Sequence, residues 1–197
     1  MMEFVLARID LVLDPGPPPA IVTQAVFQSQ NVGDTHVQGF EGSLMGQGKL
    51  GPGSLSLLAG YTFVDPKYKE FTNKIDEGSS VDYNVLKYRF KHMVKADAEY
   101  QWKGASLGLS VQHNSHMEAI DAIFEVEFVE PFKGVKNFRA THNNGFTLID
   151  VRAAYQITPA LKASFIVGNL LNEEYTLRPA LLEAPRNFTL RLDLKLR

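Results

Sequence analysis

A strict two-residue alternation of apolar and polar side chains is the feature that most constrains the fold of this chain. Between residues 94 and 102, one parity carries Val94, Ala96, Ala98, Tyr100 and Trp102, and the other carries Lys95, Asp97, Glu99 and Gln101. Similar alternation recurs at 54–64, 105–112, 146–157, 161–171 and 188–197. Because successive side chains of a strand point to opposite faces, each segment predicts a strand with one apolar and one polar face.

The connections between these segments alternate between short and long. Tight turns are expected at 51–53, 103–104 and 158–159, where glycine or proline breaks the pattern. Long links are expected at 14–34, 65–86 and 118–144, and a medium one at 173–184. With weaker strands at 1–13 and 35–50, the sequence predicts an all-β antiparallel meander of about eight strands. Three such long links are uncommon in a compact soluble domain.

A membrane setting explains this asymmetry. No run approaches the ~18–20 apolar residues that a membrane helix needs, but a tilted barrel strand crosses with only ~9–11 residues. Outer-membrane barrels combine short periplasmic turns with longer extracellular loops. We therefore expect transmembrane β-strands whose short turns face the periplasm and whose long loops face the outside.

The two faces carry different chemistry. Aromatic rings at both ends of the apolar face are expected to lie at the two lipid–water interfaces, and the alternative is that they are ordinary strand aromatics. This aromatic set is Tyr61, Phe63, Tyr100, Trp102 and Tyr155. The charged residues of the polar face are expected to face a wet lumen and to form cross-strand ion pairs. This charged set is Lys95, Asp97, Glu99, Arg152, Arg191 and Asp193.

Four segments in the same order resemble the C-terminal half of a TonB-dependent outer-membrane receptor barrel. They are Asn31-Val32-Gly33-Asp34-Thr35 with Gly39-Phe40-Glu41-Gly42, Gly60-Tyr61-Thr62-Phe63-Val64-Asp65, Val167-Gly168-Asn169-Leu170-Leu171-Asn172-Glu173-Glu174-Tyr175, and Pro185-Arg186-Asn187-Phe188-Thr189-Leu190. The third resembles the family's near-terminal "N-L-x-[ND]-x-x-Y" signature, and the fourth resembles the "P-R" start of its closing strand. The resemblance covers roughly residues 30–197.

The resemblance implies a 22-stranded barrel in the bacterial outer membrane, to which residues 1–197 would contribute the C-terminal part. It implies an N-terminal plug domain, energy from the TonB–ExbB–ExbD system, and assembly by the barrel assembly machinery into outer-membrane lipid. The implied ligand is a scarce nutrient, such as a ferric siderophore or iron chelate. The sequence contains no signal peptide or plug, so we expect a fragment. It ends in Leu196-Arg197, where the family usually has an aromatic residue.

Composition excludes several other classes of protein. The chain contains no cysteine, so disulfide frameworks and thiolate metal sites are absent. Its formal net charge is -2, which leaves no basic surplus for nucleic acid. Gly46-Gln47-Gly48-Lys49-Leu50-Gly51 matches G-x-G-x-x-G, but proline and an alternating strand follow instead of the helix that a dinucleotide site requires.

Candidate chemical groups are few. His113 and His116, with Glu118 nearby, are candidate metal ligands only if the strand ends before His116, because positions three apart point to opposite faces. His142, Asn143 and Asn144 are candidate ligand contacts in a long loop, although a solvated polar loop is the simpler interpretation. No pattern in the sequence nominates a catalytic nucleophile, so we expect no catalytic residue, no cofactor and no enzymatic activity.

Two alternatives to the receptor barrel remain open at this point. Alternation alone does not say whether the apolar face points into a core or out into lipid. A soluble eight-stranded barrel would bury that face around a small-molecule ligand. A small stand-alone porin-like barrel would expose it to lipid and conduct ions.

Overall fold

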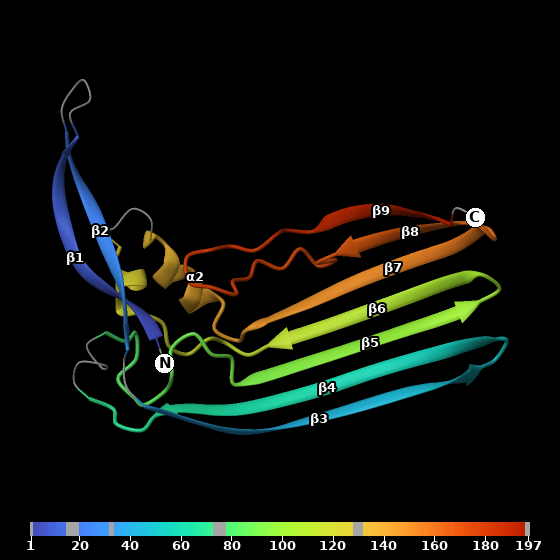
Figure 1. Ribbon diagram of the computed structural model, residues 1–197, viewed down its shortest axis with the longest axis horizontal. Helices are drawn as coiled ribbons and strands as arrows, with labels where there is room; N and C mark the ends of the chain where they lie inside the picture. Colours follow the sequence, from blue (N-terminus) through green and yellow to red (C-terminus); the bar gives the residue numbers. More distant parts are fainter. Residues whose placement is uncertain (1, 15–19, 32–33, 73–77, 128–131, 196–197) are drawn as a thin grey trace. The chain divides into compact units, whose positions relative to one another are not determined.

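The chain forms one large antiparallel sheet, one separate hairpin and a set of structured loops (Figure 1). A computed structural model describes residues 2–14, 20–31, 34–72, 78–127 and 132–195. The strands are β1 (Met2–Asp14), β2 (Ala20–Asn31), β3 (Thr35–Leu50), β4 (Gly53–Tyr68), β5 (His92–Trp102), β6 (Ala105–Asn114), β7 (Phe146–Thr158), β8 (Leu161–Gly168) and β9 (Asn187–Leu194). A 3-10 turn, η1 (Ala122–Glu125), and one short helix, α2 (Val135–Thr141), complete the elements.

The chain divides into two compact units. The sheet unit comprises residues 39–64, 90–116 and 144–197, and it contains most of the seven-stranded sheet. The loop unit comprises residues 1–38, 65–89 and 117–143. No helix in the described part of the chain is long and apolar enough to cross a membrane.

The seven strands of the sheet pair in the order in which they occur in the chain, from β3 to β9. Figure 1 shows them side by side, with the tight turns after β3, β5 and β7 at one end of the sheet. The longer connections, at residues 69–91, 115–145 and 169–186, leave from the opposite strand ends. The structure therefore confirms an antiparallel meander with short turns at one end and long links at the other.

Cross-strand registers confirm the predicted two-faced sheet. Residues directly opposite each other share a face in an antiparallel pair. Tyr100 lies opposite Leu107, which lies opposite Ala153, and these residues mark the apolar face. On the other face, Gln101 lies opposite Ser106.

The apolar face of the sheet has no protein covering it among the described residues. Leu107 is 59% exposed, Leu109 44% and Leu190 71%. An exposed apolar surface of this extent is costly in water and marks contact with lipid or with another partner. A soluble barrel would instead have buried this face, so the structure does not support that alternative.

The buried core lies mainly in the loop unit. Its buried apolar side chains are Tyr68, Val85, Leu86, Met117, Ala119, Ile120 and Phe132. Backbone hydrogen bonds join the two long links around this core, from Ser80 N to Ile120 O (2.9 Å) and from Tyr88 N to Ala119 O (2.9 Å). The long links are thus a folded layer with their own core, and not extended loops.

Several sequence predictions need correction. The predicted link at 14–34 is wrong where the structure describes it, because residues 20–31 form β2 and pair with β1. Residues 15–19 and 32–33 lie outside the described residues. The described chain therefore has nine strands instead of about eight. β8 ends at Gly168 and not at residue 171, because Asn169 adopts a left-handed backbone that ends the strand.

Two further expectations concern termini and motifs. The G-x-G-x-x-G match lies in β3 and the turn that follows it, and β4 begins at Gly53, so no helix follows the glycines. The C-terminal Leu196-Arg197 lies outside the described residues. The prediction about the closing residue therefore stays a prediction.

Candidate functional site

The six residues of the charged set share one face of the sheet. Lys95, Asp97 and Glu99 lie on β5, Arg152 lies on β7, and Arg191 and Asp193 lie on β9. The registers connect them through Ser110 and Gly108 on β6 and through β8. The sequence pattern thus predicted the shared face, whereas the lumen-facing role of these residues stays a prediction.

Arg152 is the centre of a hydrogen-bonded network on this face. Its guanidinium donates to Asp97 Oδ1 (2.6 Å) and to Ser110 Oγ (2.6 Å), and its Nε lies 3.6 Å from Glu99 Oε2. Ser110 in turn donates to Asp97 Oδ2 (2.5 Å). Arg152 on β7 therefore compensates two carboxylates on β5. These charge-assisted bonds tie β5, β6 and β7 together.

Gly108 provides the space that this arginine needs. Gly108 lies between Glu99 and Arg152 in the two registers, and a Cβ there would lie 2.5 Å from Arg152 Nε. Any other residue would push the guanidinium off the sheet surface. The alternation of the sequence assigned Gly108 to the polar face but gave no sign of this packing requirement.

The remaining charges of the face differ in how they are compensated. Arg191 contacts Asp193 on the same strand, with Nη2 2.7 Å and Nε 2.8 Å from Oδ1. Lys95 has no carboxylate within ion-pair distance among the described residues. The arginines of the face are therefore paired, and this lysine is not.

The aromatic set lies on the opposite face, at the two ends of the strands. Tyr61 and Phe63 lie near the long-link end of β4, where Phe40 and His92 pack against them at ring-centroid distances of 5.1–6.2 Å. Trp102 and Tyr155 lie in one row near the turns, since both are opposite Ala105. In the same region, Tyr100 donates its hydroxyl to Leu50 O (3.1 Å). This two-ended placement is compatible with interface anchoring, which stays a prediction.

The histidine candidates for a metal lie at the end of β6 and just after it. His113 lies on the apolar face and its Nδ1 is 2.9 Å from Thr147 Oγ1. His116 follows the end of β6 at Asn114. Among the described residues, no group of three or more histidine, aspartate or glutamate side chains is arranged to hold a metal ion. Metal binding by His113 and His116 stays a prediction.

The loop candidates His142, Asn143 and Asn144 follow helix α2 and precede β7. His142 stacks on Phe138, with ring centroids 4.1 Å apart, and its Nδ1 lies 3.0 Å from Phe138 O. This contact gives His142 a structural role at the helix end. Asn143 and Asn144 are exposed, and ligand contact by these three residues stays a prediction.

Asn169, in the signature after β8, organises the last long connection. Asn169 is 5% exposed, and its backbone has a φ of 51°. Its side chain accepts from Glu173 N (2.8 Å) and donates to Glu173 O (2.9 Å), while its own N–H donates to Asp150 Oδ1 (2.8 Å). The side-chain amide of Asn169 thus closes residues 169–173 into a loop. Tyr175 from the same signature packs against Phe146.

Substitution of Asn169 by alanine is expected to lower the free energy of unfolding by ~1–3 kcal/mol, because Glu173 loses both partners and alanine disfavours positive φ. Asn169→Gly tolerates this φ, so it is expected to cost less than Asn169→Ala while still losing the side-chain bonds. Denaturant unfolding of both variants in micelles measures the difference. Asn143→Ala, at an exposed asparagine, is the control. Equal stability of Asn169→Ala and Asn143→Ala would contradict the role of this loop.

A second buried cluster holds the loop unit together. Lys87 Nζ lies 2.6 Å from Asp121 Oδ1, and the two residues are only 3% and 5% exposed. Tyr88 donates its hydroxyl to the other carboxylate oxygen of Asp121 and has a φ of 63°, which is unusual for a bulky side chain. No periodic pattern in the sequence indicated this cluster, because its members come from two links more than thirty residues apart.

Tyr83 adds a group that titrates at alkaline pH. Tyr83 donates its hydroxyl to Glu118 Oε2 (2.9 Å), and burial together with this carboxylate raises the pKa of Tyr83 to about 12 from its usual 10.0. A raised pKa means that the neutral form is favoured in the folded protein. The stabilisation that the neutral Tyr83 hydroxyl contributes is therefore complete below pH 10 and is lost as the pH rises toward 12.

We therefore expect amide protection in residues 78–88 and 117–125 to decrease between pH 10 and 12 in the wild-type chain. Tyr83→Phe is expected to remove this pH-dependent part, because phenylalanine has no hydroxyl to ionise. Pulsed hydrogen exchange with mass spectrometry measures this amide protection at each pH. A wild-type decrease that persists unchanged in Tyr83→Phe would assign the effect to another group.

Comparison with known proteins identifies one family. A family model described as "TonB dependent receptor-like, beta-barrel" matches residues 8–170. The match covers β2 to β8 completely and about half of β1, from residue 8 to residue 14. A search of curated proteins finds no match.

Proposed function

Because this chain belongs to the family of TonB-dependent receptor-like β-barrels, whose barrels are outer-membrane proteins, we propose that it forms part of the wall of an outer-membrane receptor. The proposed activity is the active uptake of a scarce nutrient, with a ferric siderophore or another iron chelate as the substrate class. The substrate class rests on the four-segment resemblance. The family implies coupling to TonB and a nutrient ligand in general.

The observation that carries the proposal is the exposed apolar face of the sheet. This face runs over all seven strands and has aromatic residues at both ends, as an outward-facing lipid surface would. Outer-membrane lipid is therefore the partner proposed for it, and the barrel assembly machinery is the proposed route of insertion. The opposite, charged face would then face the lumen, where Arg152 and its partners remain hydrated.

The folded loop unit supports the receptor role. In the proposed orientation its two long links would lie at the extracellular side. Their own core and buried ion pair would give a ligand mouth a defined shape. We further propose that the chain acts as a receptor wall and not as an enzyme.

Fractionation tests the membrane part of the proposal. Cells that produce the chain behind an export signal are expected to contain it in the outer-membrane fraction. It should show heat-modifiable migration on a gel. A chain that remains soluble without detergent, with its apolar face protected around a ligand, would instead support the soluble barrel. Ion conductance by the purified chain would support the porin-like barrel.

Uptake tests the substrate class. A strain that lacks the gene is expected to take up less radiolabelled ferric siderophore than its parent under iron limitation, and to recover uptake when the gene is restored. Dissipation of the proton gradient should abolish the difference, because TonB coupling requires it. Equal uptake by both strains with every iron chelate tried would contradict iron as the cargo while leaving outer-membrane localisation intact.

A further inference from the structure

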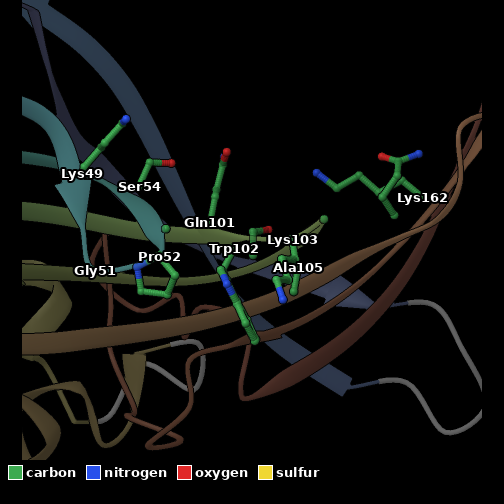
Figure 2. A pocket seen from close by; sticks show the side chains of 13 residues that line it. Lys49, Gly51, Pro52, Ser54, Gln101, Trp102, Lys103, Ala105 and Lys162 are labelled. Atoms are coloured by element: carbon green, nitrogen blue, oxygen red, sulfur yellow. The ribbon is translucent and has the colours of Figure 1, made fainter.

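A pocket of about 650 Å³ lies on the polar side of the sheet at the end that carries the tight turns (Figure 2). Its lining residues come from β3 to β8 and from the turns after β3 and β5. They are Lys49, Gly51, Pro52, Gly53, Ser54, Gln101, Trp102, Lys103, Gly104, Ala105, Ser106, Gln156 and Lys162. This turn-end pocket thus contains three lysines and no carboxylate.

The two outer lysines point onto the polar face. Phe40 packs against Tyr61 and Phe63 on the apolar face, so the opposite parity of β3, which includes Lys49, is polar. Lys162 lies opposite Gln156 on the polar face. Figure 2 shows Lys49, Gln101 and Lys162 on one side of the sheet, and Trp102 directed to the other.

The carboxylates nearest to these lysines are already occupied. Asp193 lies opposite Lys162 in the register, but its Oδ1 accepts from Arg191. Glu99 accepts from Gln101 (2.7 Å) and lies near Arg152. Because the arginines take the acidic groups, Lys49 and Lys162 have no carboxylate within ion-pair distance among the described residues.

The third lysine is held differently. Lys103 Nζ lies 5.0 Å from the centre of the Trp102 ring, so a cation–π contact draws it toward the apolar side. The uncompensated charge of the pocket therefore belongs to Lys49 and Lys162. The amide nitrogens of Gln101 and Gln156 are used within the protein, on Glu99 and on Thr158 O. A ligand would thus be recognised by charge.

The spacing of these two lysines indicates the size of the ligand. β3 and β8 are separated by five strand spacings, which corresponds to about 24 Å along the sheet. One small anion cannot contact both ammonium groups over that span. An extended polypeptide covers ~3.3 Å per residue, so about seven residues with acidic side chains would reach from one lysine to the other.

We propose that the turn-end pocket binds an acidic polypeptide segment in extended conformation, with its carboxylates on Lys49 and Lys162. The arginines of the same face are already paired with carboxylates, so they would attract such a segment less than these two lysines. The inference goes beyond nutrient uptake and does not depend on the cargo.

Fluorescence anisotropy with labelled octaglutamate, on the full chain in nonionic micelles, tests the proposal. We expect saturable binding that weakens with salt. The double variant Lys49→Gln/Lys162→Gln should weaken binding about tenfold, since two charge contacts are lost. Lys49→Arg/Lys162→Arg should keep it. Lys95→Gln, an unpaired lysine on the same face outside the pocket, should change it less than about twofold.

Three results would overturn the proposal. One is the absence of octaglutamate binding to the wild-type chain. Another is an equal loss of binding in Lys95→Gln and in the double glutamine variant, because the attraction would then belong to the whole face. The last is binding of inorganic tripolyphosphate, with the same lysine dependence, in place of octaglutamate, which would identify a small-anion site. Heat-modifiable migration of each variant confirms that it is folded.

Discussion

Replacement of Leu109 by arginine is expected to lower the free energy of unfolding in lipid vesicles by ~2–4 kcal/mol, which is the cost of a cation at the bilayer midplane on a barrel's lipid face. Leu109 lies near the middle of β6 on the apolar face, between Ala98 and Val151 in the two registers. Denaturant titration, followed by the fluorescence of Trp102, measures it, because Trp102 is the only tryptophan of the chain.

Ser106→Arg is the matched control, on the same strand but on the polar face opposite Gln101. It is expected to change the free energy of unfolding by less than ~1 kcal/mol, since an arginine there remains hydrated. If the two substitutions cost the same, the faces would not differ in environment. That result would contradict lipid contact and the receptor-wall proposal with it.

Replacement of Lys87 by methionine is expected to cost ~3–5 kcal/mol in the stability of the loop unit, because Asp121 would keep a buried charge without its cationic partner. Both side chains are almost completely buried, so water cannot replace the lost ammonium group. Hydrogen exchange in residues 78–88 and 117–125 measures this local stability. The sheet unit should keep its protection, since the ion pair lies wholly in the loop unit.

Two further variants test whether the uncompensated charge of Asp121 causes this loss of stability. Lys136→Met removes an exposed lysine from helix α2 and should leave the loop unit unchanged. Lys87→Met/Asp121→Leu removes both charges, and it should recover at least half of the loss, because an apolar pair has no uncompensated charge. A double variant as unstable as Lys87→Met would show that the ammonium group matters for more than the neutralisation of Asp121.

These two expected results come from parts of the chain that sequence reasoning treated very differently. The position of Leu109 on an apolar face was predicted directly from alternation. The pairing of Lys87 with Asp121 was not, because each lies in a link that showed no periodicity. The N-terminal hairpin was missed for a related reason: residues 20–31 alternate too weakly to separate a strand from a loop.

The candidate site residues also divide into features that alternation predicted and features that it did not. The charged set and the aromatic set each share one face of the sheet, as alternation predicted, because parity along a strand fixes the side to which a residue points. That these faces meet the lumen and the lipid stays a prediction. Their partners were not predicted. Whether Arg152 meets Asp97, Ser110 or Glu99 depends on the registers of two strand pairs, and a shift of one residue would have exchanged the faces.

Sequence alone determined the alternation, and with it the all-β meander, the two chemically different faces and the family resemblance. This was possible because each of these features depends only on neighbouring positions. Only the tertiary structure decided that the long links share a core. It also decided that, within the part of the chain that the structure describes, the apolar face stays uncovered and Lys49 and Lys162 lack carboxylate partners. Each of these outcomes depends on contacts between segments far apart in the chain, and no local pattern records them.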